Sequence, residues 1–363
     1  MPILRRVAVV ALYAGALAPL AAQTGPAAVE ITWMSMANLH YEIGELGVVT
    51  DGYITRIPQE AFFGGPSGLA STRASHRPDV EAVERVLAAL GGSRRVTLLL
   101  TGHSHWDHSF DTATWSKLSG APVVGSRTTC FQVRAEEVPA GDCTVVEGRE
   151  RMPLAAGVTM YVVRWNHSGD PARNPEQHDP VELDAVPVPD PQTGGLRAGV
   201  AEDFPNGGGS RGFLFVVDGL DGRFSWFQQS SASAVDLAVP IVVDGVDHGA
   251  PLDNLREAMT AAGLDRVDLW IGTGGYPVAR LVVPVIRPKA YLPIHWDGLW
   301  APFESGVTRP YAGGELEAYL REAAVELVPP GQYMDRWRLS AEGIEPVVNT
   351  RMKQALGFPI QAR

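Results

Sequence analysis

Three histidines and two aspartates lie within nine positions of the segment LLLTGHSHWDHSFD, at residues 98–111. The whole chain has only nine histidines, so chance explains this clustering poorly. In an extended backbone the side chains of His103 and His105 point to the same side, and both imidazoles can reach one ion. Asp107 and His108 follow where the chain turns toward a helix, and they can serve a second ion nearby. Imidazole and carboxylate ligands suit zinc, iron or manganese, so the segment predicts a metal site.

The remaining ligands must come from elsewhere in the chain, because a catalytic zinc ion usually has three protein ligands and an open position. His167 ends an apolar strand in YVVRWNHSGD, and His295 ends another in AYLPIHWDG. Each of these histidines, taken alone, is typical of an ordinary core or surface position. Because both follow apolar strands, as His103 does, all three can emerge at one edge of a layered fold.

Apolar periodicity predicts the elements that must position these side chains. Alternating or buried apolar runs indicate strands within 28–54, 94–102, 121–126, 157–165, 212–230, 267–273 and 289–297. Helical spacing indicates helices at 79–92, 110–120, 251–263 and 314–325. In the first helix the predicted buried face consists of Val80, Val83, Val86, Leu87 and Leu90, and Gly91 and Gly92 end it. Strands that alternate with helices predict a layered α/β architecture.

Residues 170–211 are rich in proline, glycine and acidic side chains, which indicates a long polar insertion in the domain. A segment of this length is either a solvated loop or the rim or lid of a site.

The N-terminus is typical of an export signal. MPILRR supplies positive charge, a 16-residue apolar run follows, and the small residues Ala21 and Ala22 precede Gln23. The run is shorter than the roughly 18–20 residues that span a bilayer. We therefore expect a signal peptide over residues 1–22, one mature domain over 23–363, and a periplasmic or secreted protein. A buried first helix or an uncleaved anchor is the alternative, and Arg5-Arg6 leaves the Sec and twin-arginine routes open.

The only two cysteines, Cys130 and Cys143, lie in TTCFQVRAEEVPAGDC. In an oxidising compartment, a disulfide that closes this short loop is the expected outcome. The alternative is that one of them ligates metal, although neither lies near a histidine in the sequence.

The charge of the chain indicates which class of binding partner to expect. The chain has 30 basic and 41 acidic residues, a net charge of −11, and basic residues that are scattered rather than clustered. A nucleic-acid backbone is therefore excluded as the expected partner, and a small-molecule substrate is expected. The oligomeric state is not indicated.

The order HSHWDH, His167, His295 resembles the metallo-β-lactamase superfamily, especially its lactonase-like and phosphodiesterase-like hydrolases. EITWMSMANLHYEI, followed by Asp51 in VVTDGY, resembles the opening strands of that branch and the aspartate of its first motif. The resemblance covers about residues 30–300. It implies an α/β fold of four layers, the αββα sandwich, with a metal site at one edge.

The resemblance also implies roles for individual residues. One ion would be held by His103, His105 and His167, and a second by Asp107, His108 and His295. Asp51 would orient a ligand histidine or the site loop by hydrogen bonding. Four histidines match nothing in the pattern, namely His40, His76, His178 and His248.

One position departs from the family pattern, because Gln229, or alternatively Ser230, stands where an aspartate bridges the two ions. A neutral side chain cannot offset two cations as a carboxylate does. We therefore expect one ion rather than two, with zinc as the expected metal and manganese or iron as alternatives. Asp170 and Asp236 are possible substitutes for the missing carboxylate.

The implied chemistry is hydrolysis, because a bound ion lowers the pKa of its water toward about 7 and so makes hydroxide available. Asp107 is the expected general base, and His295 or His108 would stabilise the oxyanion or protonate the leaving group. Aromatic residues flank the motifs, namely Phe62, Phe63, Trp106, Trp165, Trp296 and Trp300. They either cap the core or favour a small apolar ester, lactone or amide. The alternatives are a metallo-phosphodiesterase of the same fold and a degenerate relative that binds metal or ligand without turnover.

Overall fold

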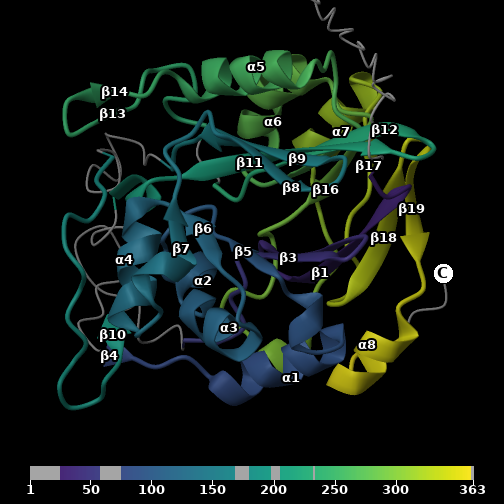
Figure 1. Ribbon diagram of the computed structural model, residues 1–363. Coiled ribbons are helices and arrows are strands. Elements are labelled where there is room, and N and C mark those ends of the chain that lie inside the picture. The colour runs from purple at the N-terminus through teal and green to yellow at the C-terminus, as the bar shows by residue number, and fades with distance from the viewer. Residues whose placement is uncertain (1–24, 58–74, 168–179, 198–204, 232–233, 361–363) are drawn as a thin grey trace, which may run out of the picture.

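Two large β-sheets lie face to face in the computed structural model, and helices cover both outer faces (Figure 1). The structure describes residues 25–57, 75–167, 180–197, 205–231 and 234–360. The arrangement of helices, sheet, sheet and helices confirms the αββα sandwich expected from the sequence. The expected signal peptide over residues 1–22 lies outside the described residues.

The first sheet has eight strands and the second has seven. The eight-stranded sheet has the order β19 (Gly343–Val347), β18 (Asp335–Ser340), β1 (Ala28–Ser35), β2 (Asn38–Ile43), β3 (Leu46–Thr50), β5 (Leu98–Leu100), β6 (Val123–Gly125) and β7 (Cys143–Val145). The seven-stranded sheet has the order β17 (Glu326–Leu327), β16 (Ala290–Pro293), β15 (Leu269–Gly272), β12 (Gly222–Gln228), β11 (Arg211–Gly219), β9 (Val158–Arg164) and β8 (Arg151–Ala155). Two small ribbons pair β4 (Ser75–His76) with β10 (Leu196–Arg197), and β13 (Val242–Val243) with β14 (Val246–Asp247).

The helices divide between the two outer faces. Figure 1 shows α5 (Pro251–Ala262), α6 (Gly275–Ile286) and α7 (Glu315–Glu322) over the seven-stranded sheet. The helices on the side of the eight-stranded sheet are α1 (Val80–Leu90), α2 (Trp106–Ser109), α3 (Thr112–Ser119), α4 (Arg127–Ala135) and α8 (Thr350–Leu356). Short 3₁₀ helices cover Ser93–Arg95, Ala140–Asp142, Pro205–Gly208 and Phe303–Ser305.

Helix α1 shows how local sequence sets an element. The Asp79 carboxylate accepts a hydrogen bond from the Ala82 backbone N–H and caps the first turn, and Gly91 ends the helix with φ +111°. Val83, Val86, Leu87 and Leu90 are buried as predicted. The placement of Val80 on the buried face was wrong, because this first residue of the helix is 48% exposed.

The main core lies between the two sheets. Phe215 of β11 stacks on Trp226 of β12 with ring centroids 4.5 Å apart, and Tyr41 of β2 contacts both rings from the opposite sheet. The Tyr41 hydroxyl donates to the Gln228 side-chain oxygen at 2.8 Å, so the buried phenol has a partner. Burial of these large rings joins the sheets and makes their edges a rigid base for the site.

Cys130 and Cys143 form the expected disulfide, which joins α4 to β7 at the edge of the eight-stranded sheet. In the part of the chain that the structure describes, no helix is long and apolar enough to cross a membrane.

Strand direction brings the motif residues to one edge. Strands β3 and β5 are parallel neighbours, so Asp51 and His103 follow strand ends on the same side of their sheet. In the other sheet β9 and β12 are both antiparallel to β11, and β12, β15 and β16 are parallel. The carboxyl ends of β9 and β16 therefore share an edge, and His167 and His295 follow them.

Candidate metal centre

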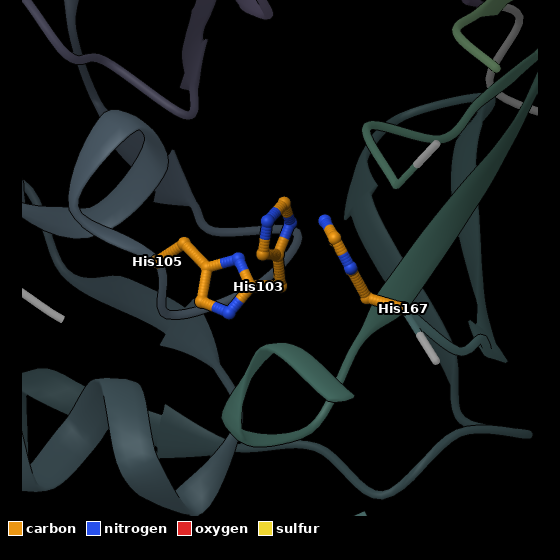
Figure 2. Close-up of side chains that lie close together, drawn as sticks. All are labelled: His103, His105 and His167. Carbon is orange, nitrogen blue, oxygen red and sulfur yellow. The ribbon is translucent and has the colours of Figure 1, made fainter. Parts of the chain in front are cut away.

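Three histidines from two sheets converge at this edge (Figure 2). His103 and His105 belong to the loop between β5 and α2, and His167 follows β9. Their ligand nitrogens all lie within 4.8 Å of one another, so one ion can reach all three. The Nε2 atom of His103 is buried without a hydrogen-bond partner in the structure. A buried polar atom in that state is expected to have a partner that protein groups do not supply, and a cation fits this requirement.

The charge state of these imidazoles also fits a metal site. Burial, with a smaller effect of the neighbouring histidines, lowers the pKa of His103 well below its ordinary value. Burial and then His105 lower the pKa of His167 to about 3. Both rings are therefore neutral at physiological pH, and a neutral imidazole has the lone pair that a metal ion needs.

A second group of ligand atoms adjoins the first. Asp107 and His108 lie in the short helix α2, and together with His103 they form another set within 4.8 Å. The Nε2 atom of His295 lies 2.9 Å from Asp107 Oδ2 and 3.1 Å from His108 Nε2. The structure thus brings together all six residues that the resemblance implied as ligands.

Asp107 is ionised in this setting. Burial opposes its negative charge, but His108 and His295 outweigh burial and hold the pKa of the carboxyl well below its usual range. Burial likewise opposes charge on His108, whereas the Asp107 and Asp51 carboxylates raise its pKa to about 9. Asp107 and His108 thus stabilise each other's charged forms.

Asp51 contacts the ligand His108 and the loop that leads to His103. Its Oδ1 accepts a 2.6 Å hydrogen bond from the Gly102 backbone N–H, and its Oδ2 is 3.5 Å from His108 Nδ1. Asp51 and His295 both have left-handed backbones, with φ +47° and +61°. Such conformations are uncommon for residues other than glycine and concentrate at functional sites.

Neither residue at the position expected for a bridging carboxylate, Gln229 or Ser230, carries a charge. The Gln229 amide donates to the Thr273 carbonyl oxygen at 2.9 Å, while Ser230 Oγ lies 3.5 Å from His103 Nδ1. Ser230, the alternative at this position, is therefore the one of the two that contacts a ligand histidine, at the ring nitrogen opposite Nε2. Asp170 lies outside the described residues, and Asp236 belongs to neither ligand group among the residues that the structure describes.

Helix α4 contacts the loop that carries His103 and His105. This contact was not predicted from the sequence. The Ser104 hydroxyl, between two ligand histidines, is 2.9 Å from Thr129 Oγ1, and Ser126 caps the helix by accepting from the Thr129 backbone N–H. The sequence GSRTTC contains this cap, but the strand before it is only three residues long. The cap was the signal that could have revealed the helix.

The aromatic residues near the motifs fall into two classes. Trp165 is fully buried against Phe227 and belongs to the core, which is the first of the two alternatives that the sequence left open. Trp106 stacks on Trp300 with centroids 5.0 Å apart and meets the Tyr53 ring edge-on. Tyr53 and Trp106 are buried in a small apolar cluster, and the half-buried Trp300 packs against its outer side.

Trp296 stacks on Trp33 and is half-buried. Phe62, Phe63 and His178 lie outside the described residues. His40 is buried, and its Nε2 atom lies 2.7 Å from the Arg95 carbonyl oxygen. In the described part of the chain, His40, His76 and His248 belong to neither ligand group.

No protein-family model and no curated protein matches the chain. Solved structures with a similar fold include an isothiocyanate hydrolase from Delia radicum gut bacteria, at 12% identity and a TM-score of 0.48, covering 86% of this chain and 100% of that chain. A metallo hydrolase from Ignicoccus hospitalis has 12% identity and a TM-score of 0.46, covering 86% and 98%. A metallo-β-lactamase from Cronobacter sakazakii has 11% identity and a TM-score of 0.32, covering 67% and 74%. Likeness of this degree concerns the fold alone.

Proposed function

We propose that the chain is an exported metal-dependent hydrolase that acts on an ester, lactone or amide of a small apolar molecule. The observation that supports this most directly is the set of three histidines, two of them buried and His167 half-buried, whose ligand nitrogens lie within 4.8 Å of one another. These side chains come from two different sheets, and burying them as neutral imidazoles is costly unless they bind something. The sandwich fold is consistent with hydrolytic chemistry but does not establish it.

His103, His105 and His167 would hold the ion. When bound, a divalent cation lowers the pKa of water and polarises a carbonyl oxygen, which is the chemistry that hydrolysis needs. Zinc suits a three-histidine set with an open position, and iron and manganese also accept nitrogen and oxygen ligands.

Asp107 is the proposed general base. Its carboxylate is ionised, buried and held by His295 at 2.9 Å, so it can accept a proton from water at a fixed position. His295 is then the group that receives a proton from Asp107 or donates one to the leaving group. Asp51 keeps His108 oriented through the 3.5 Å contact with its Nδ1 atom.

One ion per chain is the proposed stoichiometry. Ser230 offers only a hydroxyl group beside His103, so no carboxylate there offsets the charge of a second cation. We expect Ser230→Asp to raise zinc content toward two ions per chain. Gln229→Asp is the matched control, because that side chain turns toward Thr273 and should leave the content at one. Two ions in the unmodified protein would refute the proposed stoichiometry.

The substrate class is proposed from the two half-buried tryptophans that follow His295 in the chain, Trp296 and Trp300. Flat apolar rings favour an apolar or ring-bearing substrate over a highly charged one. Phosphate recognition normally uses forked cationic groups, whereas the side chains of Asp51, Asp107 and Ser230, which contact the ligand histidines, carry no positive charge.

Export is proposed from the N-terminal sequence and is supported by the Cys130–Cys143 disulfide, since such bonds persist in oxidising compartments. Fractionation of cells that express the full chain tests this point. A periplasmic or secreted protein that begins near Gln23 is expected, and full-length protein in the cytosol would contradict it.

Metal analysis combined with hydrolysis assays tests the function. We expect about one zinc per chain and turnover of p-nitrophenyl esters or lactones, with no turnover of bis-p-nitrophenyl phosphate. His103→Ala and His105→Ala should each abolish metal retention, while His76→Ala, a half-buried histidine of ribbon β4, should retain it. Metal with phosphodiester turnover alone would assign a phosphodiesterase, and metal without any turnover would assign a binding protein.

A further inference from the structure

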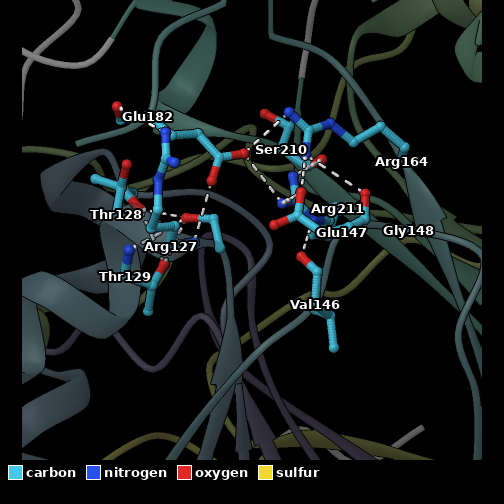
Figure 3. Close-up of polar contacts among 12 residues, drawn as sticks. Arg127, Thr128, Thr129, Val146, Glu147, Gly148, Arg164, Glu182, Ser210 and Arg211 are labelled. Atoms are coloured by element: carbon cyan, nitrogen blue, oxygen red, sulfur yellow. Dashed lines mark hydrogen bonds and ion pairs between the residues drawn. The ribbon is translucent and has the colours of Figure 1, made fainter. Parts of the chain in front are cut away.

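One buried carboxylate belongs to the long insertion rather than to the sandwich. Glu182 is buried, and its Oε1 lies 2.9 Å from Arg164 Nη2 and 3.1 Å from Arg211 Nη2 (Figure 3). Both guanidinium groups are themselves buried. Buried charges are costly unless they are paired, so these three side chains form one interdependent unit.

Arg211 links Glu182 to His103. Its backbone N–H donates to the Gly102 carbonyl oxygen at 2.6 Å, and the Ser104 backbone N–H donates to the Gly207 carbonyl oxygen at 2.7 Å. The segment 207–211 is therefore hydrogen-bonded to the residues on both sides of His103, and we call this segment the clasp.

Glu182 also rests directly on this clasp. A Cβ atom built on Gly209 would lie 2.3 Å from Glu182 Oε1, so the carboxylate and the clasp are in close contact. Gly209 has φ +93°, a backbone conformation that glycine adopts without strain.

Arg164 links the same carboxylate to His167. Arg164 is the last residue of β9, and His167 follows it in the chain. The Arg164 carbonyl oxygen accepts a hydrogen bond from the Asn254 side chain of α5, and this bond holds the end of β9.

Helix α4 is the third support that Glu182 reaches. Its Oε2 accepts from the Arg127 backbone N–H at 3.2 Å, and the neighbouring Leu183 N–H donates to Thr128 Oγ1 at 2.9 Å. Figure 3 shows Glu182 beside Arg127 and Thr128 at the start of α4. The next residue of the helix, Thr129, contacts Ser104 between the two ligand histidines.

A second carboxylate provides the comparison. Glu147 Oε2 lies 3.1 Å from Arg164 Nη1 and 3.7 Å from Arg211 Nη2, so it contacts the same two guanidinium groups. Its side chain is 53% exposed, however, and solvent screens its charge. Glu147 therefore shares the charge of Glu182 without sharing its contacts to the clasp and to α4.

We propose that Glu182 is a positioning residue for the metal ligands His103 and His167, acting through Arg211, Arg164 and the start of α4. The part of the insertion around Glu182 then supports the metal centre. This inference rests on the proposed metal site.

Cobalt binding to the full mature chain tests the proposal. Changes in groups that orient metal ligands typically cost about 10–100-fold in affinity, so Glu182→Gln should raise the dissociation constant for Co²⁺ at least tenfold and alter the d–d absorption spectrum of the bound ion. Glu147→Gln, which also removes one carboxylate charge beside both arginines, should change the constant by less than about threefold. A purely structural role predicts a lower Tm for Glu182→Gln with unchanged cobalt affinity and spectrum, and that result would overturn the proposal.

Two further outcomes are distinguishable. If the unmodified protein binds no Co²⁺ or Zn²⁺, the proposed metal site itself fails. If Glu182→Gln does not fold, Thr128→Val decides, because it removes only the acceptor of the Leu183 N–H. A weaker cobalt affinity in that variant supports positioning through α4, and an unchanged affinity contradicts it.

Discussion

Gly102 lies where three parts of the candidate site approach most closely. A Cβ atom at this position would be 2.3 Å from Ser230 Oγ and 3.0 Å from Asp51 Oδ2, whereas ordinary van der Waals contact begins at 3.4 Å. Gly102→Ala therefore forces an overlap of about 1 Å with the hydroxyl and a smaller one with the carboxylate. Overpacking of this kind typically costs about 1–3 kcal/mol of folding free energy.

The same substitution should weaken metal binding. Asp51 contacts His108, and Ser230 contacts His103, so displacement of either side chain disturbs a proposed ligand. Loss of support behind a ligand typically costs about 10–100-fold in metal affinity. The zinc dissociation constant, measured by competition with a chromogenic chelator, is expected to rise by that factor in Gly102→Ala.

Two further variants isolate the cause. Ser230→Ala removes the atom that overlaps most, so the double variant with Gly102→Ala should regain most of the lost affinity. Gly141→Ala is the matched control, because a Cβ atom there meets nothing within 4 Å, and it should bind zinc like the unmodified chain. Unchanged affinity in Gly102→Ala, or no recovery in the double variant, would refute this reasoning.

Three other predictions concern stability, each measured by urea unfolding. Replacing both Cys130 and Cys143 by alanine opens a loop with a sequence separation of 13 and should cost about 3 kcal/mol. His40 is buried and its pKa is lowered to about 4 from 6.5, so its contribution is complete above pH 6.5 and is lost as the pH falls toward 4. His40→Gln should therefore remove about 3 kcal/mol of the pH-dependent loss over that window. Lys353→Met should cost about 3–5 kcal/mol, because the Lys353 ammonium lies 2.5 Å from the buried Asp335 carboxylate.

Each of these three has a result that contradicts it. Equal urea midpoints with and without the disulfide would show that the loop retains its constraint in the unfolded chain. A His40→Gln variant whose stability falls with pH as steeply as that of the unmodified protein would show that another group titrates. Lys353→Met should recover when Asp335→Asn is added, and failure to recover would mean that the lysine acts through packing.

Local sequence predicted most of the strands and helices that carry the candidate ligands. The hairpin of β11 and β12, the capped helix α1 and the strands that end before His167 and His295 all follow from apolar periodicity and glycine positions. These features are short-range, so a single sequence contains enough information to place them.

Long-range pairing was not predictable in the same way. Strands β18 and β19 at the C-terminal end of the chain join the eight-stranded sheet beside β1, near its N-terminal end, and no short-range pattern encodes that register. Helix α6 was also missed, because its sequence GYPVARLVVPVI contains Pro284 and is rich in β-branched residues that favour strands. Packing against α5 and α7 outweighs those local preferences.

Within the candidate site, sequence reasoning identified side-chain types better than side-chain directions. Gln229 and Ser230 are neighbours at a strand end, and only the three-dimensional structure shows that the hydroxyl turns to His103 while the amide turns to Thr273. Glu182 gave no signal, because an acidic residue in a polar insertion is indistinguishable from a solvated one until its arginine partners are placed.

Anomalous diffraction from a crystal of the mature protein soaked in zinc tests the central claim most directly. The account predicts a zinc peak about 2.0–2.1 Å from one nitrogen each of His103, His105 and His167. An ordered set of these three histidines with no peak between them, or a peak held by other residues, would contradict it.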